Sequence, residues 1–92
     1  MRIIGEFDID NFKITVFKMN ERISIKFETN LLEQTYKFRD GSAINNMEDV
    51  KRFCSPDTIE KLTESFANMA SIRSTSLMSM FESEEDMFDE II

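Results

Sequence analysis

The chain of 92 residues contains no histidine, one cysteine and only two glycines. The absence of histidine removes the commonest general base near neutral pH and the commonest metal ligand. Two glycines are too few for the phosphate-binding loops of nucleotide-binding proteins. The single cysteine, Cys54, excludes an internal disulfide and fits a reducing compartment. We therefore expect no enzyme, no cofactor and no metal site.

Long apolar runs are also missing, so the sequence predicts no membrane-spanning segment. Acidic residues begin at Glu6, too early for the apolar core of a signal peptide. The pI of about 4.5 argues against direct nucleic-acid binding, which needs clustered Lys and Arg. We expect a cytoplasmic protein whose partner is a protein with a basic surface.

The residues that are present indicate one small folded domain, since 41% are apolar and nine are phenylalanine. Within residues 1–40, apolar and polar side chains alternate, with short polar breaks near residues 10, 20 and 30. Connections this short require antiparallel neighbours. The pattern predicts a four-stranded antiparallel β-meander in an α+β fold.

The alternation also places some apolar residues on the outer face of the sheet. These are Ile4, Phe17, Met19 and Leu31. An apolar patch of a few hundred Å² on this face would mark an interface. The alternatives are that the C-terminal segment folds back over it, or that the hydrophobic residues are scattered singly.

A short helix is predicted from Asn45 or Asn46, either of which can cap it, to about Cys54. Val50 and Phe53 would be its inward pair. Cys54 then precedes the next helix, where a thiol could have a lowered pKa and be reactive. Without a histidine partner, we favour a small buried apolar side chain at this junction.

A longer helix is predicted to start at Ser55-Pro56, since serine caps helices and proline suits the first helical position. Its apolar stripe would pack on one face of the sheet. The stripe consists of Ile59, Leu62, Phe66, Met69 and Ala70. Residues 74–76, Ser-Thr-Ser, favour turns over helix interiors, so we expect the helix to end or bend there.

The last fourteen residues contain six acids and no base, whereas residues 1–40 contain seven of each. Six apolar residues lie among these acids, which a tail for solubility alone does not need. They are Met80, Phe81, Met87, Phe88, Ile91 and Ile92. We therefore divide the chain into a domain over residues 1–78, with its sheet in 1–40 and its helices in 45–78, and an acidic amphipathic segment over 79–92. A short helix from Glu84 would need a surface to dock on.

The predicted function is a non-enzymatic interaction module, or a subunit of a larger assembly, that docks through this segment. The partner would offer a hydrophobic groove rimmed by Lys or Arg. The predicted anchors are Met87, Phe88, Ile91 and Ile92, and the predicted steering charges are Asp86, Asp89 and Glu90. The alternatives are an acidic inhibitor or nucleic-acid mimic in a basic channel, and a homodimer.

Four stretches of the sheet region, residues 3–6, 13–17, 20–28 and 32–38, together resemble small uncharacterised proteins of Bacteroidota bacteria. The resemblance covers about the first forty residues and contains no catalytic signature. It implies a cytoplasmic bacterial protein and transfers no functional residue to this chain.

Overall fold

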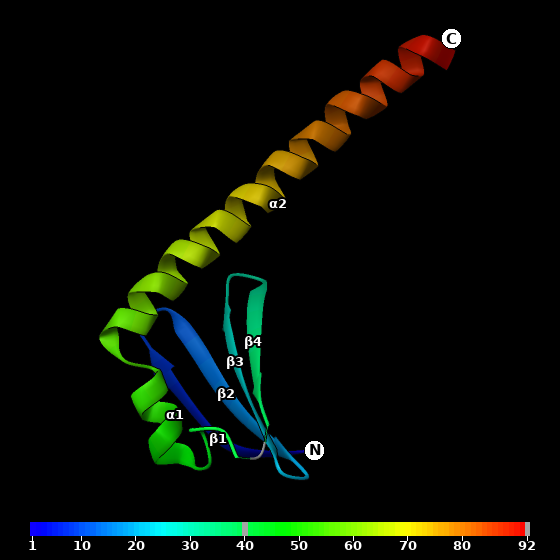
Figure 1. Cartoon of the computed structure of the whole chain (residues 1–92). Helices are drawn as coiled ribbons and strands as arrows, with labels where there is room; N and C mark the ends of the chain where they lie inside the picture. Colours follow the sequence, from blue (N-terminus) through cyan, green and yellow to red (C-terminus); the bar gives the residue numbers. More distant parts are fainter. Residues whose placement is uncertain (40, 92) are drawn as a thin grey trace.

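The computed structural model describes the backbone of residues 1–39 and 41–91, and the side chains of residues 1–39 and 41–82. Four strands precede two helices, which is the predicted α+β arrangement (Figure 1). The elements are β1 (Arg2–Ile9), β2 (Phe12–Met19), β3 (Arg22–Thr29), β4 (Leu32–Phe38), α1 (Met47–Phe53) and α2 (Pro56–Ile91).

The four strands form one antiparallel sheet in the order β1-β2-β3-β4, which confirms the predicted meander. Val16 on β2 lies opposite Gly5 on β1 and Ile25 on β3. Val16 and Ile25 are fully buried, because both point to the face that the helices cover. The alternation of apolar and polar residues therefore sets which face of the sheet is buried.

The expected face of Ile4 is wrong because the pairing of β1 shifts between Ile3 and Gly5. Ile3 pairs with Phe17 and is exposed, whereas Ile4 packs against the core. A bulge adds one residue to a strand and so reverses the faces beyond it. Gly5 leaves room for Met47, because a Cβ at this position would lie 2.5 Å from Cε of Met47 and would displace the end of that side chain.

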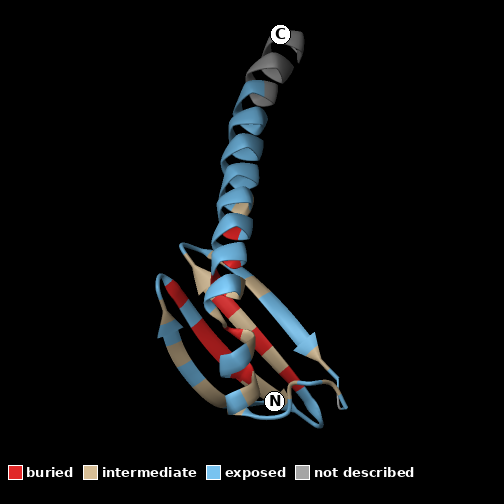
Figure 2. Cartoon of the chain, turned by 60° about the vertical axis from the view of Figure 1, so that its left-hand side comes forward, coloured by how far each residue is buried: buried red, intermediate tan, exposed pale blue. Residues whose placement is uncertain are grey.

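The core lies between the inner sheet face and the two helices (Figure 2). Phe12 and Phe66 join the sheet to α2, with ring centroids 5.0 Å apart. Phe53 of α1 packs against the rings of Phe27 and Phe38 at 6.5 and 5.2 Å. The buried apolar residues are Phe12, Ile14, Val16, Ile23, Ile25, Phe27, Val50, Cys54, Ile59, Leu62 and Phe66.

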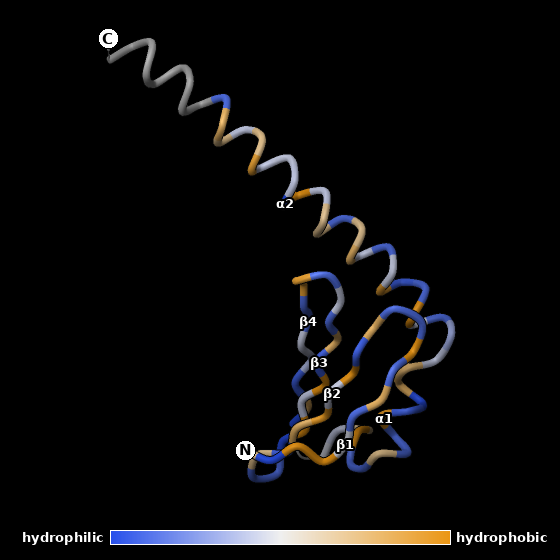
Figure 3. Tube along the Cα trace, turned by 180° about the vertical axis from the view of Figure 1, so that it is seen from behind, coloured by the Kyte–Doolittle hydropathy of each residue, from blue (hydrophilic) through white to orange (hydrophobic). Residues whose placement is uncertain are grey.

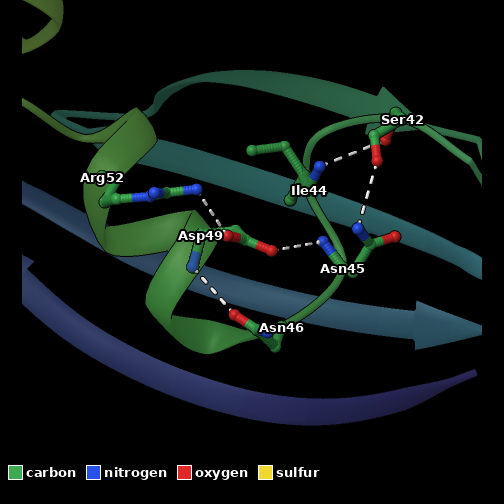
Figure 4. Close-up of polar contacts among 6 residues, drawn as sticks. All are labelled: Ser42, Ile44, Asn45, Asn46, Asp49 and Arg52. Atoms are coloured by element: carbon green, nitrogen blue, oxygen red, sulfur yellow. Dashed lines mark hydrogen bonds and ion pairs between the residues drawn. The ribbon is translucent and has the colours of Figure 1, made fainter.

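Helix α1 begins at the predicted position, with Asn46 as its N-cap (Figure 4). The backbone N–H of Asp49 donates to Oδ1 of Asn46 at 2.9 Å, and the N–H of Asn45 donates to Oδ2 of Asp49 at 3.0 Å. The expected inward pair is confirmed, since Val50 is fully buried and Phe53 packs on the core.

Helix α2 begins at Pro56, as predicted, and the N–H of Thr58 donates to Oγ of Ser55 at 3.3 Å. Three residues of the expected stripe are buried and Met69 is half-buried, but Ala70 is exposed because the sheet ends before it. The break expected at residues 74–76 is wrong, as is the separate helix from Glu84. One helix continues to Ile91, since no glycine or proline follows Pro56 to interrupt it.

Candidate protein-interaction surface

The candidate site is the part of α2 that extends past the sheet (Figures 1 and 2). Among the described residues, the side-chain hydrogen bonds between α2 and the sheet come from Gln34 of β4. Its amide donates to the hydroxyl of Ser65 at 2.6 Å and lies 2.9 Å from Sδ of Met69. Every residue from Ala70 to Glu82 is exposed. We call residues 70–91 of α2 the arm.

Three large apolar side chains on the arm form one face, which we call the arm stripe: Leu77, Met80 and Phe81. Their exposed fractions are 42%, 59% and 66%. Leu77 and Met80 lie eighteen residues, or about five helical turns, after Ile59 and Leu62. The stripe therefore continues the face of α2 that packs on the sheet, and hydrophobic positions recur along the exposed helix in Figure 3.

The arm's charge is unbalanced, because Arg73 is its one base and the six acids after Ser79 belong to it. Glu82 is the last of these acids with a described side chain, and it is exposed. The other predicted interaction residues lie outside the residues with described side chains. They are Asp86, Met87, Phe88, Asp89, Glu90, Ile91 and Ile92.

The composition of the arm gives its helix little intrinsic stability. Residues 71–79 include four serines and Thr75, which have lower helix propensity than alanine. Helices in proteins gain most of their stability from packing of an apolar face, yet in the described residues the arm stripe is not part of the core and does not pack against it. A partner surface would supply that packing.

A groove of about 370 Å³ lies where the arm leaves the sheet. One wall is α2, and the other is formed by the β1–β2 and β3–β4 turns. Phe12, Leu32 and Phe66 give it an apolar floor, while Asp10 and Arg73 lie on its rim. The groove therefore lies at the base of the arm, and its lining ends at Ser74, before the arm stripe begins.

The β3–β4 turn beside this groove contains an unusual residue. Asn30 and Leu31 both have positive φ, at 48° and 67°, which is the combination that type I′ hairpin turns require. Asn-Gly is the usual pair there, because a Cβ in this conformation costs roughly 1–2 kcal/mol. Leu31 is nevertheless 90% exposed at the tip of the hairpin.

The outer sheet face has a short apolar strip, which we call the outer strip: Ile3, Phe17 and Met19. Ile3 and Phe17 are register partners, and Met19 follows on the same face of β2. Ile3 and Met19 are about half exposed, and Lys26 Nζ lies 5.5 Å from the Phe17 ring centroid. The expected outer positions of Phe17 and Met19 are confirmed.

Cys54 is buried at the junction of α1 and α2, as favoured from the sequence. Burial disfavours the charged thiolate and raises the pKa of this thiol from 9.0 to about 11. A reactive cysteine needs a lowered pKa and access to solvent. The structure therefore assigns Cys54 to the core.

No family model, curated protein or solved structure matches the chain. Among the described residues, no group of His, Cys, Asp or Glu has the arrangement to bind a metal ion. Within the same part of the chain, neither helix has the length and hydropathy to span a bilayer.

Proposed function

We propose that this protein is a non-enzymatic interaction module, in which the sheet domain anchors the arm for binding to a protein partner. The supporting observation is the arm stripe, which continues the packed face of α2 beyond the sheet and leaves Leu77, Met80 and Phe81 exposed. Exposed apolar residues in a row on one helix face are typical of helix-in-groove recognition.

The acids at the end of the arm define the chemistry of the partner. A groove with an apolar floor and a rim of Lys or Arg would match both properties of the arm. In this proposal Met87, Phe88, Ile91 and Ile92 extend the apolar contact, while Asp86, Asp89 and Glu90 steer the approach. Charge would then set the association rate, and apolar contacts would set the dissociation rate.

The charge pattern of the domain disfavours a nucleic-acid mimic. A mimic needs acids over much of its surface, whereas residues 1–40 contain as many bases as acids. A homodimer remains compatible with the arm, because a second copy is also a protein partner.

Binding experiments with arm variants test the proposal. Three chains are immobilised: the full chain, a chain ending at Met78 and the double variant Leu77→Gln/Phe81→Gln. The proteins that each immobilised chain retains, including further copies of the chain itself, are then quantified. Glutamine removes apolar area but keeps helix propensity. Thr75→Gln on the opposite helix face is the matched control. We expect a retained protein that both arm changes lose and the control keeps; equal retention by all four chains would refute the proposal.

A further inference from the structure

Charge is separated along the strands of the sheet. Bases gather at the end that contains the β2–β3 turn, opposite the end where α2 leaves the sheet (Figure 1). We call this group the basic end: Arg2, Lys18, Arg22, Lys37 and Arg39. Glu21 is an acid in the turn itself, and Asp40, which follows Arg39 in the sequence, lies outside the described residues. The neighbouring helix α1 is balanced, with two acids and two bases.

The opposite end of the sheet has the reverse charge. The strands next to the β1–β2 and β3–β4 turns contain four acids and one base, namely Asp8, Asp10, Glu28, Glu33 and Lys13, and Arg73 of α2 lies beside them. The acidic arm leaves the domain from this side. The molecule is therefore acidic at one end and basic at the other.

The outer strip lies next to the basic end. Met19 pairs with Arg22 across the β2–β3 hairpin, and Phe17 pairs with Ser24, which in turn pairs with Lys37. The strip is thus a partly exposed apolar surface with bases along its border. This is the chemistry that the arm requires of a partner, and the chain itself contains it.

We propose that the arm of one copy binds the outer strip and basic end of a second copy, head to tail. This inference rests on the proposed function and names its partner. The arm stripe would lie on Ile3, Phe17 and Met19, and the acids beyond it would face Arg22, Lys37 and Arg39, the bases on the side of the outer strip. Because ions screen charges over about 8–10 Å, these local contacts decide the interaction despite the net charge of −7 per copy.

A symmetric pairing of two arms is the less favourable dimer. Side by side in parallel, each arm would place its six acids against the six of its neighbour. In antiparallel register, the acids of one arm would meet only Arg73 of the other. The basic end offers Arg22, Lys37 and Arg39 on the side of the outer strip, so charge complementarity favours the head-to-tail contact.

The shape of the molecule makes this contact intermolecular. The molecule is 60 Å long, and the arm points away from the basic end (Figure 1). A chain therefore cannot place its arm on its own outer strip without breaking α2. A head-to-tail contact also leaves one free arm and one free basic end in every complex, so it repeats until a ring closes or a filament grows.

Sedimentation of the full chain over a range of concentrations tests the proposal. We expect the average mass to rise beyond that of a dimer with concentration and to fall when salt is raised. The arm variant Leu77→Gln/Phe81→Gln and the basic-end variant Arg22→Glu/Lys37→Glu should each weaken self-association by about tenfold or more. Thr75→Gln should behave as the unchanged chain does.

Mixing the two variants distinguishes this contact from every symmetric one. The arm variant retains a basic end and the basic-end variant retains an arm, so their mixture should form a one-to-one complex that grows no further. A pairing of two arms predicts instead that the basic-end variant still associates alone. That result, or self-association unaffected by either variant, would overturn the proposal.

The failure of this inference can be separated from failure of the proposed function. If the full chain stays monomeric while the arm still retains another protein, the second copy is the wrong partner and the interaction module stands. If the chain stays monomeric and nothing depends on the arm, both proposals are wrong.

Discussion

At the scale of single residues, Phe66 and Phe81 show that one face of α2 is buried against the sheet near its start and exposed to solvent further along. Both are phenylalanines on the same side of α2, separated by about four turns. Phe66 is 4% exposed and contacts Phe12, whereas Phe81 is 66% exposed. Their identical chemistry allows the contribution of burial to be measured directly.

We expect Phe66→Ala to lower the free energy of unfolding by about 3–5 kcal/mol, the range for emptying a core aromatic site. This is a large share of a small domain's stability. Phe81→Ala, measured by the same denaturant titration on the monomer, should change it by less than about 0.5 kcal/mol. Equal losses at both positions would show that the arm packs on the domain.

Leu31 provides a second test at this scale. Leu31→Gly should raise the free energy of unfolding by up to about 1 kcal/mol, because glycine adopts positive φ without steric cost but loses more conformational entropy on folding. Leu31→Ala keeps the Cβ and should leave stability nearly unchanged. A loss of stability in the glycine variant would mean that the leucine side chain makes a stabilising contact.

Cys54 links stability to alkaline pH. Its pKa is raised to about 11 in the folded chain, so the unfolded chain loses the thiol proton at lower pH. Stability from this group is complete below about pH 8 and falls as pH rises towards the folded pKa. Urea midpoints measured from about pH 8 to pH 10 should therefore decline more steeply for the native chain than for Cys54→Ala. Parallel declines would contradict the burial of the thiol.

At the scale of whole elements, α2 has two parts with different roles. Its first turns complete the core through Ile59, Leu62 and Phe66, and its later turns meet no other element in the described residues. The sheet is long enough to cover only the first part. Removing the second part should therefore leave the domain intact.

We expect a chain ending at Arg73 to unfold cooperatively, with a free energy within about 0.5 kcal/mol of the full monomer. Its far-ultraviolet circular dichroism should lose the helical signal of the arm. A chain ending at Thr63 lacks Phe66 and Met69 and should fail to fold stably, which makes it the matched control. A chain to Arg73 without a cooperative transition would show that the arm belongs to the core.

At the scale of the whole molecule, the sequence predicted the elements that local chemistry determines. Alternation identified β2 and β3, and Ser55-Pro56 identified the start of α2. The bulge before Gly5 was missed because one inserted residue leaves no signal in an alternating pattern. The straight helix through Ser74 was also missed, since weak helix formers lower stability without breaking a helix.

The candidate site was only partly predictable for a related reason. The acids and hydrophobic residues after Ser79 are visible in the sequence. The exposure of Leu77 and of the outer strip, in contrast, depends on how the helices and the sheet pack together. The basic end likewise arises because strand pairing brings Arg2, Lys18 and Lys37 to the same end of the sheet. Such distant residues are brought together by register, which a linear reading cannot show.

The shape of the monomer permits a final prediction. The radius of gyration is 18.3 Å, whereas a compact chain of this length has about 12 Å, because the arm extends beyond the domain. Small-angle scattering of the dilute arm variant Leu77→Gln/Phe81→Gln should give about 18 Å. A value near that of the compact chain would show that α2 bends and its C-terminal part covers its own sheet. The arm would then be an intramolecular lid over the outer face, and both proposals for its binding would lose their basis.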